Sequence, residues 1–168
     1  SGGGSAQAKI GTALFTLEGD ESALASVSAL LDVCGVHHRE IASSDKPLYH
    51  AAAVCASNLA VGLFASAQTM LERCGFGADE ARGALRPLFV GNCESIAERG
   101  PIDALTGPIE RNDAETVVGH LMAFREDPTL LKERDAYTAL SRVVVEVAAA
   151  KHPERDYSHI AEILRAAR

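Results

Sequence analysis

The sequence predicts a mainly α-helical protein, and three observations support this fold class. Apolar residues recur with helical spacing in nearly every segment after Ser43. The long stretch from Pro47 to Leu71 is rich in alanine and contains no Asp, Glu, Lys or Arg, which is typical of a helix inside a bundle. Alternation typical of strands occurs only near the N-terminus. We therefore expect a multi-helix bundle preceded by a short βαβ unit.

The N-terminal part is expected to be a remnant of a larger sheet. Ser1–Ser5 reads SGGGS, a flexible linker that we exclude from the fold, so that residues 6–43 form the βαβ unit. Ile10–Leu17 and Val36–Ala42 are the predicted strands, and Glu21–Cys34 is the helix between them. Such a unit places its strands parallel, with a right-handed crossover. Because two strands do not make a stable sheet, we expect the other strands to lie upstream of this chain.

Residues 44–168 are expected to form one all-helical domain, organised around the helix Pro47–Leu71. Asp45 or Ser44 suits its N-cap, and Gly75 is a typical residue after its end. This helix is expected to be central and buried, with the others packed around it. The remaining expected elements are a helix at Asp79–Arg99, an irregular loop at Thr106–Asp113, and helices at Asn112–Phe124, Pro128–Ala150 and Tyr157–Ala167. Pro87 should kink or divide the second helix, and Asn112 should cap the third.

Charge and composition exclude several partners. The chain of 168 residues has 16 Lys and Arg against 23 Asp and Glu, a net charge of −7, without any basic stripe. Nucleic acid and anionic membrane surfaces are therefore not expected partners. The run Pro47–Leu71 is long enough to span a bilayer, but it carries His50, Ser57, Asn58 and Gln68, and alanine rather than leucine or isoleucine is its commonest residue. We interpret it as a helix of a soluble protein.

The four cysteines predict neither a disulfide framework nor a metal site. They stand at positions 34, 55, 74 and 93, too far apart for a zinc knuckle or a CxxC motif. We expect reduced thiols in the core of a cytoplasmic protein. The histidines lack partners at ligand spacing, so we propose no metal.

Two motifs indicate a family. The run Asp45–Asn58 and the later segment Leu105–Asp113, followed by Thr116-Val117 and His120, resemble a family of two-domain proteins of uncharacterised function. In that family a Rossmann-like NAD(P)-binding domain precedes an all-helical C-terminal domain. The family is similar to ketopantoate reductase, pyrroline-5-carboxylate reductase and 6-phosphogluconate dehydrogenase. The resemblance implies that residues 6–43 are the last βαβ piece of the Rossmann-like domain, and that the helical domain resembles the 6-phosphogluconate dehydrogenase C-terminal domain.

The resemblance also implies a site and a partner. The helical domains of these relatives build a homodimer and one wall of a cleft for a small-molecule substrate. The relatives place a Lys or an Asn on the first long helix; at the matching face this chain has His50, Val54 and Asn58. A histidine can act as a general acid to a carbonyl, and Asn58 can donate to the same oxygen, so the expected catalytic residues are His50 and Asn58. The expected substrate-binding residues are Ser57, Thr106, Gly107 and Arg111.

Each of these residues also has a structural interpretation. His50 and Asn58 are equally well explained as hydrogen-bonded polar residues inside a bundle. Arg111 would bind a substrate carboxylate, or it would form an ion pair with a neighbouring acidic residue. Thr106 and Gly107 would shape a turn before they line a cleft.

The nucleotide-binding motif is missing from the chain. No GxGxxG follows a strand, so we expect no cofactor in this chain and NAD(P) only in a full-length protein. The predicted function is the dimerisation and substrate-cleft domain of an NAD(P)-dependent oxidoreductase. The alternative is a non-catalytic dimerisation or interaction module on a reductase scaffold. The sequence leaves open whether the full-length protein is an enzyme, and this chain alone is expected to be inactive.

Overall fold

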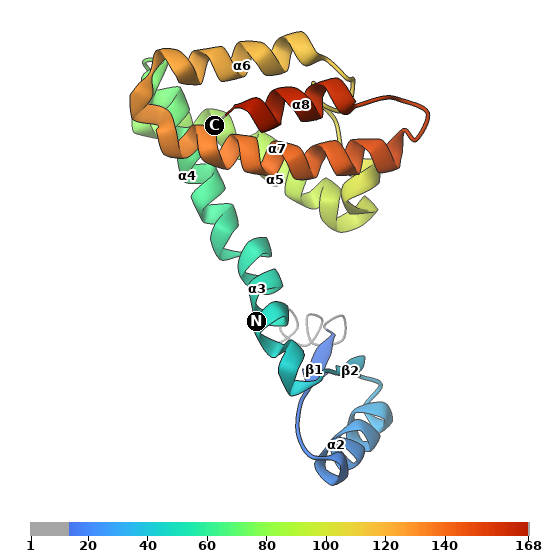
Figure 1. The fold of residues 1–168 in the computed structure, drawn as a ribbon. Helices are drawn as coiled ribbons and strands as arrows, with labels where there is room; N and C mark the ends of the chain where they lie inside the picture. The colour runs from blue at the N-terminus through green and yellow to red at the C-terminus, as the bar shows by residue number, and fades with distance from the viewer. Residues whose placement is uncertain (1–13, 168) are drawn as a thin grey trace. The chain divides into compact units, whose positions relative to one another are not determined.

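A computed structural model describes residues 14–167 and confirms the mainly helical fold with a short βαβ segment at its N-terminal end (Figure 1). The chain separates into two compact units whose boundary lies between Leu59 and Ala60.

The first unit contains the βαβ segment. Strands β1 (Phe15–Leu17) and β2 (His38–Glu40) pair in parallel, with Phe15 opposite His38, and α2 (Glu21–Val33) connects them. Asp20 caps α2 by accepting a hydrogen bond from the Ala23 amide at 2.9 Å. The predicted parallel arrangement is confirmed for the described residues, and both strands are shorter than expected. The part of the first predicted strand at Ile10–Ala13 lies outside the described residues.

The predicted helix Pro47–Leu71 is two helices. After a 3₁₀ turn at Ser43–Asp45, α3 runs over Lys46–Ala56 and α4 over Asn58–Arg73. Ser57 separates them with non-helical dihedrals, φ −122° and ψ −77°, and its hydroxyl donates to the Ala53 carbonyl at 2.6 Å. A serine hydroxyl that bonds to the carbonyl four residues earlier competes with the helical ladder, which is one reason for a break here.

The second unit contains most of α4 and all later helices. These are α5 (Ala78–Ala104), α6 (Ala114–Glu126), a 3₁₀ turn at Pro128–Leu130, α7 (Leu131–Lys151) and α8 (Ser158–Ala166). Helices α6, α7 and α8 pack together, as Figure 1 shows. Their apolar faces form the core, which consists of Ile109, Val117, Val145, Ala148, Tyr157, Ile160 and Leu164. Ile160, Leu164 and Val117 are the largest fully buried side chains among the described residues.

The expectation of a buried central helix is wrong for the single chain. Helices α3 and α4, each described in full, contain no buried residue. Leu48 is 77% exposed and Val61 is 71% exposed. In α5 two large apolar side chains are also exposed, since Leu88 is 66% and Ile96 is 50% accessible. The core forms instead from the C-terminal helices, whose apolar residues face one another within the chain.

Three smaller expectations need correction. Helix α5 continues through Pro87, and its non-helical interior residue is Gly100, with φ 78°. The N-cap of α6 is Asp113 rather than Asn112: the Asp113 carboxylate accepts from the Thr116 amide at 3.0 Å, whereas Asn112 adopts a positive φ of 58°. The four cysteines are free thiols as expected, but all are exposed and none belongs to the core.

Candidate functional site

The loop between α5 and α6 carries three of the predicted substrate-binding residues. It turns at Gly107, whose φ of 104° favours glycine, and again at Asn112. Inside the loop the Asp113 amide donates to the Pro108 carbonyl at 2.8 Å and the Arg111 amide donates to the Gly107 carbonyl at 3.1 Å. Ile109 is buried in the core. These bonds give the loop a defined backbone conformation.

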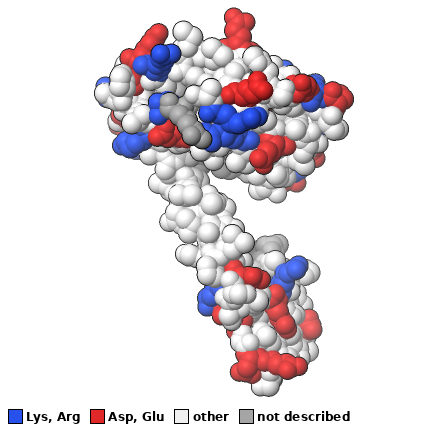
Figure 2. All heavy atoms as spheres, in the orientation of Figure 1, with Lys and Arg blue, Asp and Glu red and all other residues white. Residues whose placement is uncertain are grey.

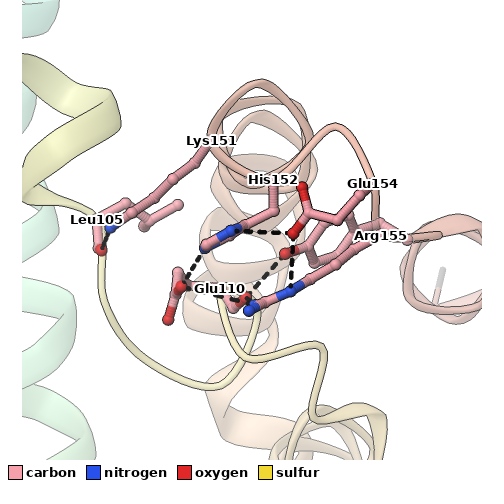
Figure 3. Close-up of polar contacts among 7 residues, drawn as sticks. Leu105, Glu110, Lys151, His152, Glu154 and Arg155 are labelled. Carbon is pink, nitrogen blue, oxygen red and sulfur yellow. Dashed lines mark hydrogen bonds and ion pairs between the residues drawn. The ribbon is translucent and has the colours of Figure 1, made fainter.

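Glu110 fastens this loop to the turn between α7 and α8 (Figure 3). Its carboxylate lies 2.5 Å from Nε2 of His152, and its backbone carbonyl accepts from the Tyr157 hydroxyl at 2.8 Å and from the Arg155 guanidinium at 3.0 Å. Glu154 joins the cluster through His152 and Arg155, at 3.5 and 3.6 Å. One residue of the loop therefore receives contacts from three side chains of the C-terminal turn.

Two further bonds fix the ends of the loop. The Lys151 ammonium donates to the Leu105 carbonyl at 2.7 Å, and the Asn112 side-chain amide donates to the Asp156 carbonyl at 3.0 Å. Partners so far apart in sequence are brought together only by the packing of α7 and α8 on the core. We call Leu105–Asp113 with its contacts from Lys151–Tyr157 the anchored loop.

The electrostatics of the anchored loop favour ionised carboxylates. The hydrogen bond from His152 lowers the pKa of Glu110, and the positive charges of Lys151 and Arg155 add to this effect. Hydrogen bonds from Thr116 lower the pKa of Asp113, with a smaller contribution from Arg111. Both carboxylates are therefore charged at neutral pH. Their partners indicate that they hold the loop and cap α6.

The anchored loop exposes the residues that the sequence assigned to substrate. Thr106 and Arg111 are exposed and Gly107 is partly exposed. Thr106 lines a hollow of about 370 Å³, whose other walls come from α5 and α7. The positive charge of Arg111 lowers the pKa of Asp113, which agrees with the structural alternative, although the Arg111 side chain forms no salt bridge among the described residues. Gly107 shapes the turn through its positive φ, in line with the structural interpretation of this residue.

The predicted catalytic residues have a different environment. His50 on α3 is exposed, and so are Ser57 and Asn58 at the break between α3 and α4. The Ser57 hydroxyl lies 3.0 Å from Oδ1 of Asn58, so these two side chains are in contact. The interpretation of His50 and Asn58 as buried polar residues of a bundle is not met in the single chain. They belong to the first unit, whereas the anchored loop belongs to the second, and their assignment to one site stays a prediction.

Sequence reasoning missed Glu110 and its partners from the C-terminal turn. His152, Arg155 and Tyr157 lie more than 40 positions away from Glu110, and nothing in their local pattern indicates a common loop. The only sequence signal was the motif around Glu110 itself, since a loop rich in Gly, Pro and charged residues needs partners to be ordered. Among the described residues no group of three His, Cys, Asp or Glu side chains could hold a metal ion.

Comparison with known families decides the relationship. Residues 13–144 match the family described as a domain of unknown function, DUF2520. The chain belongs to this family. Searches of the curated proteins and of the solved structures found no match.

The match to DUF2520 covers the loop motif but not the C-terminal turn that contacts it. It includes both motifs, Asp45–Asn58 and Leu105–Asp113, together with His120. It ends at residue 144, before the segment Lys151–Tyr157 that anchors the second motif. The loop motif is therefore within the family match, while the long-range bonds that join it to Lys151–Tyr157 come from outside it.

Proposed function

We propose that this chain is the dimerisation and substrate-cleft domain of an NAD(P)-dependent oxidoreductase. The observation that carries the proposal is the exposed run Pro47–Leu71, which has no charged residue and makes up most of α3 and α4. The atoms of this run are white in Figure 2, at the place of α3 and α4 in Figure 1. Exposed apolar surface of this extent on a soluble protein marks an interaction site.

The partner is a second copy of the chain. An interface with two-fold symmetry places the same residues of both copies against each other, so a charged face repels itself while an uncharged one does not. The run Pro47–Leu71 has no charge that would need an opposite charge on a partner. Gly62 and Ser66, one helical turn apart on α4, leave room for close approach of another helix.

The apolar run also has the length of a membrane span. By length and composition alone Ser43–Arg73 could cross a bilayer, and none of its most apolar window is buried in the chain. The break at Ser57, the polar residues His50, Asn58 and Gln68, and the predominance of alanine favour protein packing over lipid. We therefore assign the surface to a dimer.

The oligomeric state of the chain tests this step. Sedimentation velocity at micromolar concentration should give a dimer of two 17.7 kDa chains. Val61→Asp places a charge on the exposed face of α4 and should yield monomers. Val143→Asp is the matched control, because Val143 is 55% exposed on α7 and lies outside the uncharged run. A monomeric wild-type chain, or one that sediments with phosphatidylcholine vesicles, would refute the dimer.

The catalytic part of the proposal concerns a full-length protein that includes a nucleotide-binding domain. His50 would donate a proton to the substrate oxygen during hydride transfer, Asn58 would bind the same oxygen, and Ser57, Thr106, Gly107 and Arg111 would hold the substrate. Its NAD(P)H oxidation should be screened with small 2-oxo acids and cyclic imines. Where turnover occurs, His50→Ala should reduce kcat about 100-fold or more, and His159→Ala, an exposed histidine of α8, should not.

The second candidate is a non-catalytic dimerisation module. Val54 favours it, since this apolar residue lies between His50 and Asn58 where the relatives place polar groups. A dimer that oxidises no nicotinamide cofactor with any substrate of the panel would support this candidate over the first.

A further inference from the structure

A second hollow in the helical unit has the features of a ligand pocket. It lies between the C-terminal end of α4, helix α6 and the start of α7, and its volume is about 500 Å³, within the range of small-molecule sites. Met70, Phe124 and Leu130 provide apolar walls, and the side chains of His120 and Tyr137 provide polar groups. We propose that this hollow binds a small uncharged organic molecule that carries a hydroxyl or carbonyl group.

The polar centre of the pocket is a histidine–tyrosine pair. Nδ1 of His120 lies 2.9 Å from the Tyr137 hydroxyl, and the two rings meet edge to face with centroids 5.7 Å apart. If the hydroxyl donates to Nδ1, then Nε2 carries the proton and the phenolic oxygen accepts from a ligand. If Nδ1 donates to the hydroxyl instead, the hydroxyl donates to the ligand and Nε2 accepts from it. The pair therefore offers one donor and one acceptor in either tautomer, which suits an alcohol or a ketone.

The pair is held in place on one side and accessible on the other. Phe124 packs against the Tyr137 ring at 5.5 Å, and Tyr137 is partly buried while His120 is exposed. Burial raises the pKa of the Tyr137 hydroxyl, so this group remains protonated and acts as a hydrogen-bonding group. The protonated hydroxyl can therefore recognise a ligand by hydrogen bonding.

The charged groups of the pocket disfavour a negatively charged ligand. Nε of Arg73 lies 3.8 Å from the Asp127 carboxylate, and Glu126 adds a second negative charge to the lining. The one guanidinium therefore already has a partner, and the lining carries one negative charge in excess. A small carboxylate or phosphate would meet this excess charge, whereas a neutral molecule would not.

This pocket is independent of the site under the proposed function. None of the six predicted catalytic and substrate-binding residues lines it, and of its lining only Met70 belongs to the run Pro47–Leu71. His120, in contrast, is part of the second family motif and has no role in the proposed dimer or cleft. The pocket gives that motif residue a function of its own.

A titration followed by amide NMR tests the proposal. Cyclohexanol and cyclohexanone serve as neutral probes, and cyclohexanecarboxylate is the charged analogue of similar shape. Both neutral probes should shift the amide signals of Ala123, Phe124 and Leu130 in the wild-type chain at millimolar concentrations, and the carboxylate should bind more weakly. Tyr137→Phe keeps the packed ring and removes the hydroxyl, which should weaken binding about fivefold, the effect of one neutral hydrogen bond.

The test also needs a control variant and a second pocket variant. His159→Ala changes an exposed histidine of α8 and should leave the affinity unchanged. His120→Ala changes an exposed residue and should weaken binding even if Tyr137→Phe disturbs the fold. The proposal is overturned if the neutral probes shift no signal at Ala123–Leu130, if the carboxylate binds equally well, or if both pocket variants bind like the wild type.

Discussion

The anchored loop and the His50–Asn58 segment are two parts of one predicted site, yet their surroundings in the chain are opposite. The loop receives hydrogen bonds from Lys151, His152, Arg155 and Tyr157, and its Ile109 enters the core. The segment has no buried residue, and its serine bonds only to neighbours in sequence. The chain alone determines the shape of the loop. Among residues 14–167, no long-range bond of this kind holds the segment.

Under the proposed dimer, this difference predicts where the second copy makes contact. A polar loop that is fully bonded within its own chain presents its exposed side chains in a fixed arrangement, before any ligand arrives. Apolar helices that are exposed to water are stabilised only when another surface covers them. We therefore expect mutations near the loop to change the stability of the monomer, and mutations on α3 and α4 to change association.

The largest expected effect is a difference in unfolding free energy between alanine variants of two leucines. Leu164→Ala in α8 removes a fully buried side chain of the core cluster that also contains Ile109 of the anchored loop, and it should lower the free energy of unfolding by about 2–5 kcal/mol. Leu48→Ala in α3 changes a residue that is 77% exposed and should cost less than about 0.5 kcal/mol in the monomer. Urea unfolding at nanomolar concentration measures both. Equal costs at that concentration would contradict the contrast, because they would mean that α3 is packed within its own chain.

A smaller effect is expected for one bond of the anchored loop. Tyr157→Phe removes the hydroxyl that donates to the Glu110 carbonyl and keeps the buried ring. The expected loss of unfolding free energy is about 1–2 kcal/mol, since a buried acceptor loses one partner and retains Arg155. Tyr49→Phe, at a tyrosine of α3 that is 47% exposed, is the control and should be nearly neutral. If the two variants were equally stable, the tyrosine bond would not fix the loop.

The sequence predicted the fold class and most helix positions because these depend on local patterns. The 3.6-residue periodicity marked the helical segments, and the alternation before Gly19 marked a strand whose parallel pairing is confirmed. Whether the chain itself buries Pro47–Leu71 could not be predicted from such a pattern. An apolar run shows that a segment avoids water, but not whether the same chain or a second molecule covers it.

The candidate site was predictable only in part, for a similar reason. The motif around Gly107 and Pro108 indicated a constrained loop, and the loop is there. Its bonds to His152 and Arg155 depend on how α7 and α8 pack, which no local pattern contains. The break at Ser57 was also missed, because a single serine is common in helices and breaks them only where its hydroxyl and the backbone adopt an alternative geometry.

The smallest expected effect is a pH dependence at Glu110. Its pKa is lowered in the folded chain by the His152 hydrogen bond, so ionised Glu110 contributes stability above its usual pKa of about 4.3. This contribution is lost as the pH falls through the lowered pKa. Glu110→Gln cannot ionise, so its Tm should lie below that of the wild type at pH 7 and approach it toward pH 3. Glu162→Gln, at an exposed carboxylate of α8, should leave the Tm nearly unchanged at every pH. A gap between Glu110→Gln and the wild type that stays constant from pH 7 to pH 3 would mean that the loop is held by backbone bonds to Tyr157 and Arg155, and not by the charge of Glu110.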